Sequence, residues 1–517
     1  MNLRVASLVC CVVCVARLVC GCGTGQAPLA SSSPAHVPQP TAAEAREALP
    51  AELSRLNAEA RAGAVNEQVA GLAVDDPYRS LESDTPQTQA WLKAQSDHTE
   101  QVLAAYRDPK AEERLTRLLE IGTLGEIDIS SAAKNPRVFF TLREHPRERP
   151  ALYMIDLTAP LEAGVLRAAP PLVDPKSFGE RAAIDYMVPS HSGRYVALGV
   201  SDNGDERSTL RVFDVEQKKL LPDAIGHAKW SRVTWLDDDT GLFYTRYPKP
   251  GEPSWNEREP DGYNSWLYAH KLGQPVDSDP LVFKGDKPTD FVGATLDDTG
   301  RYAVLSNRRS WTANDLWLWD RGAPPAKRGL VPPANKLVPL VRDLDKRTFV
   351  DAKQGQLYLT TNIDAPKQRV VKVDIANAGD HTRWKTVIPE GDAAIEDVIV
   401  TEQFIVVHRL RDVQSRLELY SQEGELLGEI GLPGIGALSA LTGSHGHDHI
   451  AFVWSSLLHA PALFTCDLDT RQVQPLYEVQ HDFDSSSYEL QQASVAAGDG
   501  PHLNRFLTRK KGPPPAR

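Results

Sequence analysis

The chain has 517 residues, too many for one compact core, so its length indicates an export segment and one large or two smaller domains. Apolar residues make up 41% of the chain and charged residues 24%, as in ordinary globular proteins. The formal net charge of −12 argues against binding to a phosphate backbone, so we expect no nucleic-acid partner.

Residues 1–22 are expected to be a lipoprotein signal peptide. Arg4 supplies a positive start, and the segment from Val5 to Val19 is mostly apolar but too short to be a membrane-spanning helix. A small residue precedes Cys22, as in a bacterial lipobox, so we expect lipidation at Cys22, with plain signal cleavage as the alternative. The protein would then be exported as a periplasmic or outer-membrane lipoprotein, held to the membrane by its lipid.

Residues 23–50 contain many small and polar residues and are expected to be a disordered linker. Residues 51–122 are expected to form a helical N-terminal segment. Within it, Thr85 followed by a proline is typical of a helix start, and Asp108 followed by a proline repeats the signal. Both helices are amphipathic, so each needs a surface to cover.

From residue 135 the pattern changes to short β-rich runs divided by Gly, Asp and Pro, and we expect the domain that they form to span residues 123–485. Seven strand starts follow a polar or glycine turn, at intervals of 46 to 60 residues: Val138, Tyr195, Leu242, Tyr302, Leu357, Phe404 and Ile450. In six of the seven units a second apolar strand begins 13 to 15 residues later. This regular repeat predicts an all-β fold, a seven-bladed β-propeller preceded by a short α-helical N-terminal region.

Several segments resemble the prolyl oligopeptidase family. Residues 76–82, Asp-Pro-Tyr-Arg-Ser-Leu-Glu, resemble a segment near the start of that family, with Ser80 in place of a tryptophan. Residues 189–195 resemble the turn of the family's second blade, and residues 235–248 are the most specific match. The likeness runs in register from about residue 70 to about residue 512.

The resemblance implies a function in peptide cleavage. In the family, a seven-bladed propeller covers an α/β-hydrolase domain and admits only short peptides, which are cleaved after proline. The nucleophile is a serine in a Gly-x-Ser-x-Gly-Gly turn, followed along the chain by aspartate and histidine. We therefore expect the substrate-gating propeller of a serine-type endopeptidase, with short peptides as partners and no cofactor.

The 517 residues contain no Gly-x-Ser-x-Gly sequence, so we assign no catalytic residue. Residues 506–512 resemble the strand that enters the hydrolase domain, so residues 486–517 are expected to lead to a missing domain of roughly 200 or more residues. We expect the chain by itself to be inactive, with a separately encoded hydrolase domain as a candidate partner. The alternative is a non-catalytic, lipid-anchored propeller that binds peptides or proteins.

Two residue groups in the last blade are candidates for binding. In the family, a Phe-Thr-Ser-Phe stretch helps to line the proline pocket; Trp454 and Leu457 stand at the ends of the matching stretch, which implies that they face substrate. Packing within the blade is the alternative for Trp454. His445, His447 and His449 alternate in a pattern that can bind a metal, but we expect a solvated turn and no metal there.

Overall fold

The computed structural model describes residues 50–512 except 133, 159–169, 324, 326–327, 480, 482, 499 and 501. The chain divides between Leu119 and Glu120 into a helical unit and a propeller unit, close to the boundary after residue 122 that the sequence suggests. Among the described residues, no helix combines the length and the apolar character needed to cross a membrane.

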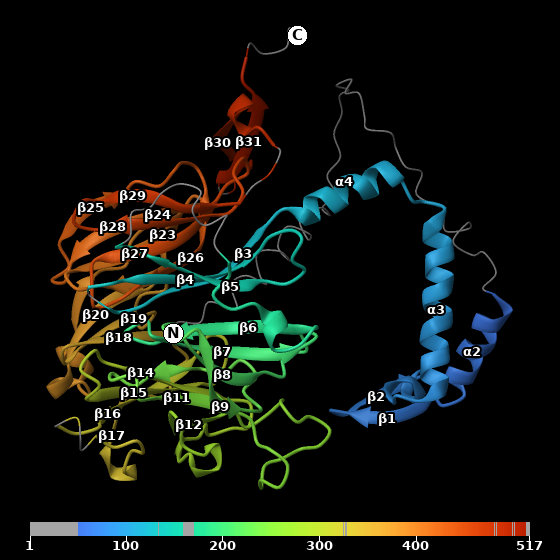
Figure 1. The fold of residues 1–517 in the computed structure, drawn as a ribbon, viewed down its shortest axis with the longest axis horizontal. Coiled ribbons are helices and arrows are strands. Elements are labelled where there is room, and N and C mark those ends of the chain that lie inside the picture. Colours follow the sequence, from blue (N-terminus) through green and yellow to red (C-terminus); the bar gives the residue numbers. More distant parts are fainter. Residues whose placement is uncertain are drawn as a thin grey trace. The chain divides into compact units, whose positions relative to one another are not determined.

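The described residues of the helical unit form three helices and a β-hairpin (Figure 1). Its elements are α2 (Ala51–Arg61), β1 (Val65–Val69), β2 (Leu72–Asp76), the 3₁₀ turn η2 (Arg79–Glu82), α3 (Pro86–Ala104) and most of α4 (Pro109–Glu120). Helix α3 begins as the sequence predicts, because Thr85 Oγ1 accepts a hydrogen bond from Thr88 N at 3.1 Å and Pro86 takes the first helical position.

Ser80, where the family has a tryptophan, lies at a close approach between η2 and the end of α2. Its hydroxyl donates to Ala60 O at 2.9 Å. A Cβ atom built on Gly63 would lie 2.9 Å from Ser80 Cβ, closer than real contacts allow. The small residue therefore suits this contact within the helical unit.

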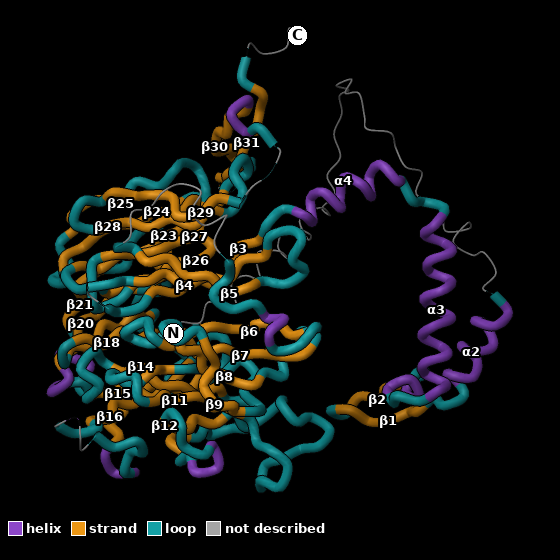
Figure 2. The backbone as a smooth tube through the Cα atoms, viewed as in Figure 1, coloured by secondary structure: helices purple, strands orange, loops and turns teal. Residues whose placement is uncertain are grey.

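In the described part of the propeller unit, seven separate antiparallel sheets form the seven blades predicted from the sequence (Figures 1 and 2). Three strands of blade 1 are described: β3 (Thr123–Ile129), β4 (Arg137–Arg143) and β5 (Ala151–Asp156). Blade 2 has β6 (Ala182–Pro189), β7 (Tyr195–Asp202), β8 (Thr209–Asp214) and β9 (Lys219–Ile225). Blade 3 has β10 (Thr234–Trp235), β11 (Gly241–Arg246), β12 (Trp266–Lys271) and β13 (Leu281–Phe283).

The remaining four blades each have four strands in chain order. Blade 4 has β14 (Phe291–Leu296), β15 (Tyr302–Arg308), β16 (Asn314–Asp320) and β17 (Leu337–Val341). Blade 5 has β18 (Thr348–Lys353), β19 (Gln356–Thr361), β20 (Arg369–Asp374) and β21 (Lys385–Ile388). Blade 6 has β22 (Ala394–Val400), β23 (Phe404–Arg411), β24 (Gln414–Ser421) and β25 (Leu426–Ile430). Blade 7 has β26 (Ala437–Gly443), β27 (His449–Ser455), β28 (Ala462–Asp467) and β29 (Gln472–Glu478), and a hairpin of β30 (Tyr488–Ala496) and β31 (His502–Lys510) follows.

Apolar packing between neighbouring blades holds the ring together. One core cluster joins Ile399 and Val406 of blade 6 to Ile450 and Phe452 of blade 7. Burial of apolar surface stabilises a fold by roughly 25 cal/mol per Å², so these buried faces between sheets stabilise the ring. The first strands of neighbouring blades, such as β14 and β18, contact each other and therefore lie innermost.

The ring closes between blades 7 and 1 by side-chain packing. In the described sheets, no strand of one of these blades pairs with a strand of the other. Instead, Leu124 and Phe140 share a core cluster with Val453 and Leu463. A closure of this kind depends on the fit of side chains, without a continuous ladder of backbone hydrogen bonds.

Candidate functional site

The strand order gives the ring two distinct faces. Because the strands of each blade alternate in direction, the start of β3 and the end of β29 lie on the same face, which we call the entry face. The turns from each first strand to the second lie on the opposite face, which we call the turn face. The two faces carry different side chains.

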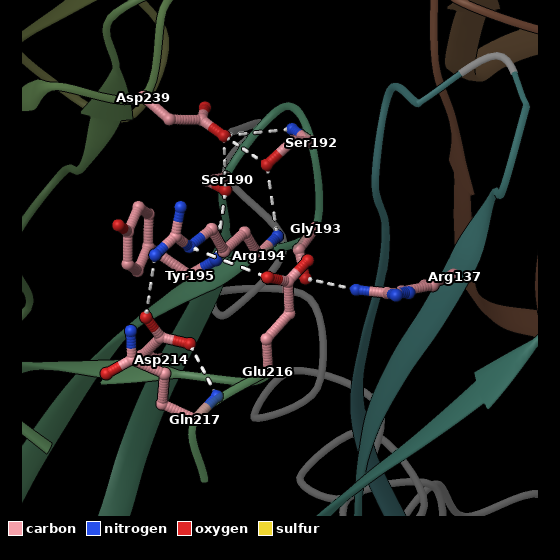
Figure 3. Close-up of polar contacts among 10 residues, drawn as sticks. All are labelled: Arg137, Ser190, Ser192, Gly193, Arg194, Tyr195, Asp214, Glu216, Gln217 and Asp239. Carbon is pink, nitrogen blue, oxygen red and sulfur yellow. Dashed lines mark hydrogen bonds and ion pairs between the residues drawn. The ribbon is translucent and has the colours of Figure 1, made fainter. Parts of the chain in front are cut away.

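On the turn face, two of the segments that resemble the prolyl oligopeptidase family, residues 189–195 and 235–248, meet at the carboxylate of Asp239 (Figure 3). This carboxylate accepts hydrogen bonds from Ser190 Oγ at 2.8 Å, His191 N at 3.0 Å and Ser192 N at 3.1 Å. Asp239 belongs to blade 3 and the three donors belong to the turn of blade 2. These matched residues therefore join two blades.

Gly193 in the same turn fits against blade 1. Its φ angle is 70°, and a Cβ atom there would lie 3.0 Å from Ser130 Cβ. Arg137 of blade 1 donates from Nη1 to Gly193 O at 3.1 Å (Figure 3). The turn of blade 2 is thus held from both neighbouring blades.

Similar contacts join other blades on the turn face. Thr401 Oγ1 of blade 6 donates to Asp448 Oδ1 of blade 7 at 2.7 Å. Gln354 N of blade 5 donates to Asp298 Oδ1 of blade 4 at 2.7 Å. The turn face is accordingly a set of structural links between blades.

Two of the three alternating histidines, His445 and His447, belong to this set, so the expectation of a solvated turn is wrong. His447 is 4% exposed, and its Nε2 donates to Ser130 O at 2.8 Å across the closure of the ring. His445 Nε2 lies 2.7 Å from Asp351 Oδ1 of blade 5. The turn is buried because it packs against other blades, which a local polar sequence does not reveal. Within the described part of the chain, no three His, Cys, Asp or Glu residues are grouped to hold a metal.

One serine–histidine contact resembles a nucleophile beside its base. Ser415 Oγ lies 2.8 Å from His408 Nε2 in blade 6. Ser415 is only 4% exposed, and its hydroxyl also accepts a hydrogen bond from Leu438 N at 2.9 Å. A nucleophile needs access to its substrate, so we assign this pair no catalytic role.

Both predicted substrate-facing residues lie at the entry-face end of blade 7, one at the end of β27 and one just after it. Trp454 is 3% exposed and packs edge-on against Phe464, with ring centroids 6.3 Å apart. Leu457 is 65% exposed. The structure therefore places Trp454 in the blade core and gives only Leu457 a free surface.

A cavity of about 70 Å³ lies at the entry-face ends of the first strands of blades 3, 4 and 5. Three arginines line it: Arg232 just before β10, Arg308 at the end of β15 and Arg347 just before β18. We call this the arginine pocket. Sequence analysis missed it, because the three residues are far apart in the chain and only the positions of the innermost strands bring them together.

The three guanidinium groups of the arginine pocket lack an acidic partner. Among the described residues, no carboxylate lies within ion-pair distance of Arg232, Arg308 or Arg347, whereas the adjacent Arg309 pairs with Asp315 at 2.8 Å. Burial, and after it the positive charges of Arg308 and Arg347, lower the pKa of Arg232 to about 10. Burial also lowers the pKa of Arg308 and that of Arg347.

The predicted signal peptide and its lipidation site, Cys22, lie outside the described residues. Residues 23–49 of the predicted linker also lie outside them. Export and lipid attachment stay predictions.

Comparison with known proteins agrees with the architecture. Residues 57–479 match the family described as the prolyl oligopeptidase N-terminal beta-propeller domain. The chain is 27% identical to a prolyl endopeptidase of Elizabethkingia meningoseptica over 86% of this chain and 60% of that protein. It is 25% identical to a prolyl endopeptidase of Dictyostelium discoideum over 85% of this chain and 64% of that protein. The chain thus spans less than two thirds of the length of these relatives.

Solved structures give the same result. A structure from a study of two prolyl endopeptidases aligns with a TM-score of 0.71 and 25% identity, over 86% of this chain and 63% of that one. Prolyl oligopeptidase B from Galerina marginata, bound to a 25mer macrocyclization substrate, aligns with a TM-score of 0.74 over 86% of this chain and 64% of that one; its 20% identity supports the fold alone. This chain belongs to the family of prolyl oligopeptidase N-terminal propeller domains.

Proposed function

We propose that this chain is the substrate-gating propeller of a prolyl oligopeptidase-type serine peptidase, and that its 517 residues gate peptides without cleaving them. The match to the family's propeller domain over residues 57–479 carries this proposal. The substrates would be short peptides that contain proline, as the names of the relatives suggest.

The direction of the chain supports a role for the entry face. The chain enters and leaves the seven-bladed ring on this face, so flanking segments attach there. The hairpin β30–β31 follows the same path, and Asn504 Nδ2 donates to Asp412 Oδ1, in the turn between β23 and β24 on the entry face, at 3.2 Å. A hydrolase partner would therefore cover the entry face, and peptides would meet its side chains.

The DNA that follows codon 517 tests the proposal. Translation in three frames is expected to reveal a Gly-x-Ser-x-Gly-Gly sequence followed by aspartate and histidine. Co-expression of that frame with the 517-residue chain should produce hydrolysis of a Gly-Pro chromogenic peptide. If no such frame exists, the non-catalytic peptide-binding propeller becomes the better account.

The export prediction has its own test. Metabolic labelling with a radioactive fatty acid should mark the full-length chain and should fail to mark the Cys22→Ser variant. Equal labelling of both proteins would contradict lipid attachment at Cys22.

A further inference from the structure

The arginine pocket combines three cations with no acidic partner among the described residues. Other buried guanidinium groups in this chain meet a carboxylate, as Arg409 does with Glu418 at 2.9 Å, or a backbone carbonyl, as Arg321 does with Gly300 O at 2.6 Å. Three like charges that line one half-buried cavity repel one another and destabilise the fold. An unfavourable arrangement of this kind is typical of a binding site whose ligand supplies the missing charge.

Aromatic rings hold two of the guanidinium groups in place. The Arg308 guanidinium lies over the ring of Phe291 at 4.7 Å and over that of Trp311 at 5.1 Å. The Arg347 guanidinium lies over Phe349 at 4.5 Å. Stacking on a ring occupies the face of a guanidinium and leaves its N–H donors at the edge free for a planar, two-oxygen acceptor.

Two other polar residues of the pocket, Thr234 and Asn314, form hydrogen bonds within the protein, and neither carries a charge that could neutralise the arginines. Thr234 Oγ1 donates to Ala294 O at 2.8 Å. Asn314 accepts from Thr348 N at 2.8 Å and donates to Thr348 O at 2.8 Å. The hydrogen-bonding capacity left in the cavity is therefore dominated by arginine donors.

The size and the walls of the pocket select a class of ligand. A cavity of about 70 Å³ has room for a few water molecules or one small head group, and not for a whole peptide. Beside it, Trp311 is 71% exposed and offers an apolar surface to the remainder of a ligand. A small anionic group on a larger, partly apolar chain fits this combination better than a free inorganic ion does.

We propose that the arginine pocket binds the carboxylate of a glutamate or aspartate side chain, so that the entry face selects peptides that carry an acidic residue. This inference deepens the proposed function and rests on it only for the assumption that peptides reach the entry face. The contacts would come from Arg232, Arg308 and Arg347, with two parallel N–H···O bonds available to each carboxylate.

Isothermal titration of the purified 517-residue chain tests this proposal. The probes are two short peptides with blocked ends, acetyl-Gly-Pro-Glu-Glu-Gly-amide and its Gln-Gln counterpart, which differ only in charge. We expect the Glu peptide to bind at least about tenfold more tightly and to lose that advantage at high salt. Equal affinity for the two peptides, or binding of neither, would overturn the proposal.

Matched variants locate the binding. Arg347→Gln and Arg308→Gln should each reduce the preference for the Glu peptide by about tenfold or more. Arg505→Gln, which removes the same charge from the exposed strand β31, should leave it unchanged. If Arg505→Gln has the same effect as Arg347→Gln, the attraction is a general effect of charge and the pocket assignment is wrong.

Two further readouts exclude simpler explanations. Inorganic phosphate at the same ionic strength should compete weakly; competition as strong as that of the Glu peptide would replace the peptide assignment with a free-anion site. Without ligand, Arg347→Gln should melt at the same temperature as the parent chain or higher, because one repelling charge is gone. A lower melting temperature would show that Arg347 is structural and would contradict the proposal. None of these results depends on Gly-Pro hydrolysis. A failure of the arginine pocket to bind acidic peptides can therefore be distinguished from a failure of the proposed function.

Discussion

Asp239 is the residue on which the junction of blades 2 and 3 depends most, since one carboxylate receives donors from three consecutive residues, Ser190 to Ser192. Charge-assisted hydrogen bonds contribute about 1.5–3 kcal/mol each, and donors left without a partner add a penalty. Asp239→Ala should therefore lower the free energy of unfolding by roughly 3 kcal/mol or more, as measured by denaturant titration. The neighbouring Asp238 is exposed and bonds only within its own turn, so Asp238→Ala is the matched control and should cost far less. Equal losses in the two variants would show that Asp239 does not link the blades.

His270 provides a second test at this scale, through pH. It lies between two buried carboxylates, with Nε2 2.8 Å from Asp223 of blade 2 and Nδ1 2.9 Å from Asp279, which also accepts from Tyr244 Oη at 2.8 Å. Burial acts to lower the pKa of His270, but the hydrogen bonds to Asp279 and Asp223 outweigh it and raise the pKa above its usual value.

The sign of the pH effect follows from that shift. The charged His270 contributes stability that is fully present below the unfolded pKa of about 6.5 and is lost as pH rises through the higher folded pKa, by about 1.4 kcal/mol for each unit between the two. Denaturation of the parent chain at a series of pH values should show this loss as the pH rises above about 6.5. The His270→Gln variant should lack this dependence of stability on pH. If the variant keeps the same dependence, another group causes it.

At the scale of elements, the closure between blades 7 and 1 is the place where a small change should matter most. A Cβ atom on Gly446 would lie 1.8 Å from Ser131 O, so Gly446→Ala must push the turn of blade 7 away from blade 1. Overpacking of this kind costs about 1–3 kcal/mol. In hydrogen exchange, the backbone amides of blades 1 and 7 should be the first to lose protection in this variant, compared with the parent chain. Gly226→Ala is the control, because a Cβ atom there meets nothing within 4 Å. Similar exchange in the two variants would argue against this closure.

The strands of the blades show how far the sequence could predict the fold. The seven strand starts found from the sequence lie in the second strand of each blade, and the apolar strands that follow are the third strands. These strands are buried on both faces, as β11 is at all six positions, so they form continuous apolar runs that are easy to recognise. The first and fourth strands of the blades were not predicted, because they lack such apolar runs. For example, β10 has only two residues, and β29 is largely exposed and contains Pro475.

The site was less predictable than the fold, because its residues come from distant parts of the chain. Trp454 was chosen by its position in a matched stretch, and the structure places it in the blade core. The arginine pocket, by contrast, forms from residues at the ends of β15 and just before β10 and β18, which no local pattern connects. Its three members become neighbours only when blades 3, 4 and 5 take their places in the ring.

At the scale of the whole molecule, the proposed function is that these 517 residues gate peptides without cleaving them. The most direct measurement is hydrolysis of a Gly-Pro chromogenic peptide by the purified chain alone, with and without a serine-directed inhibitor. We predict no turnover above the buffer rate, because no accessible nucleophile and base were found together among the described residues and the sequence lacks Gly-x-Ser-x-Gly. Turnover that the inhibitor abolishes would contradict the account.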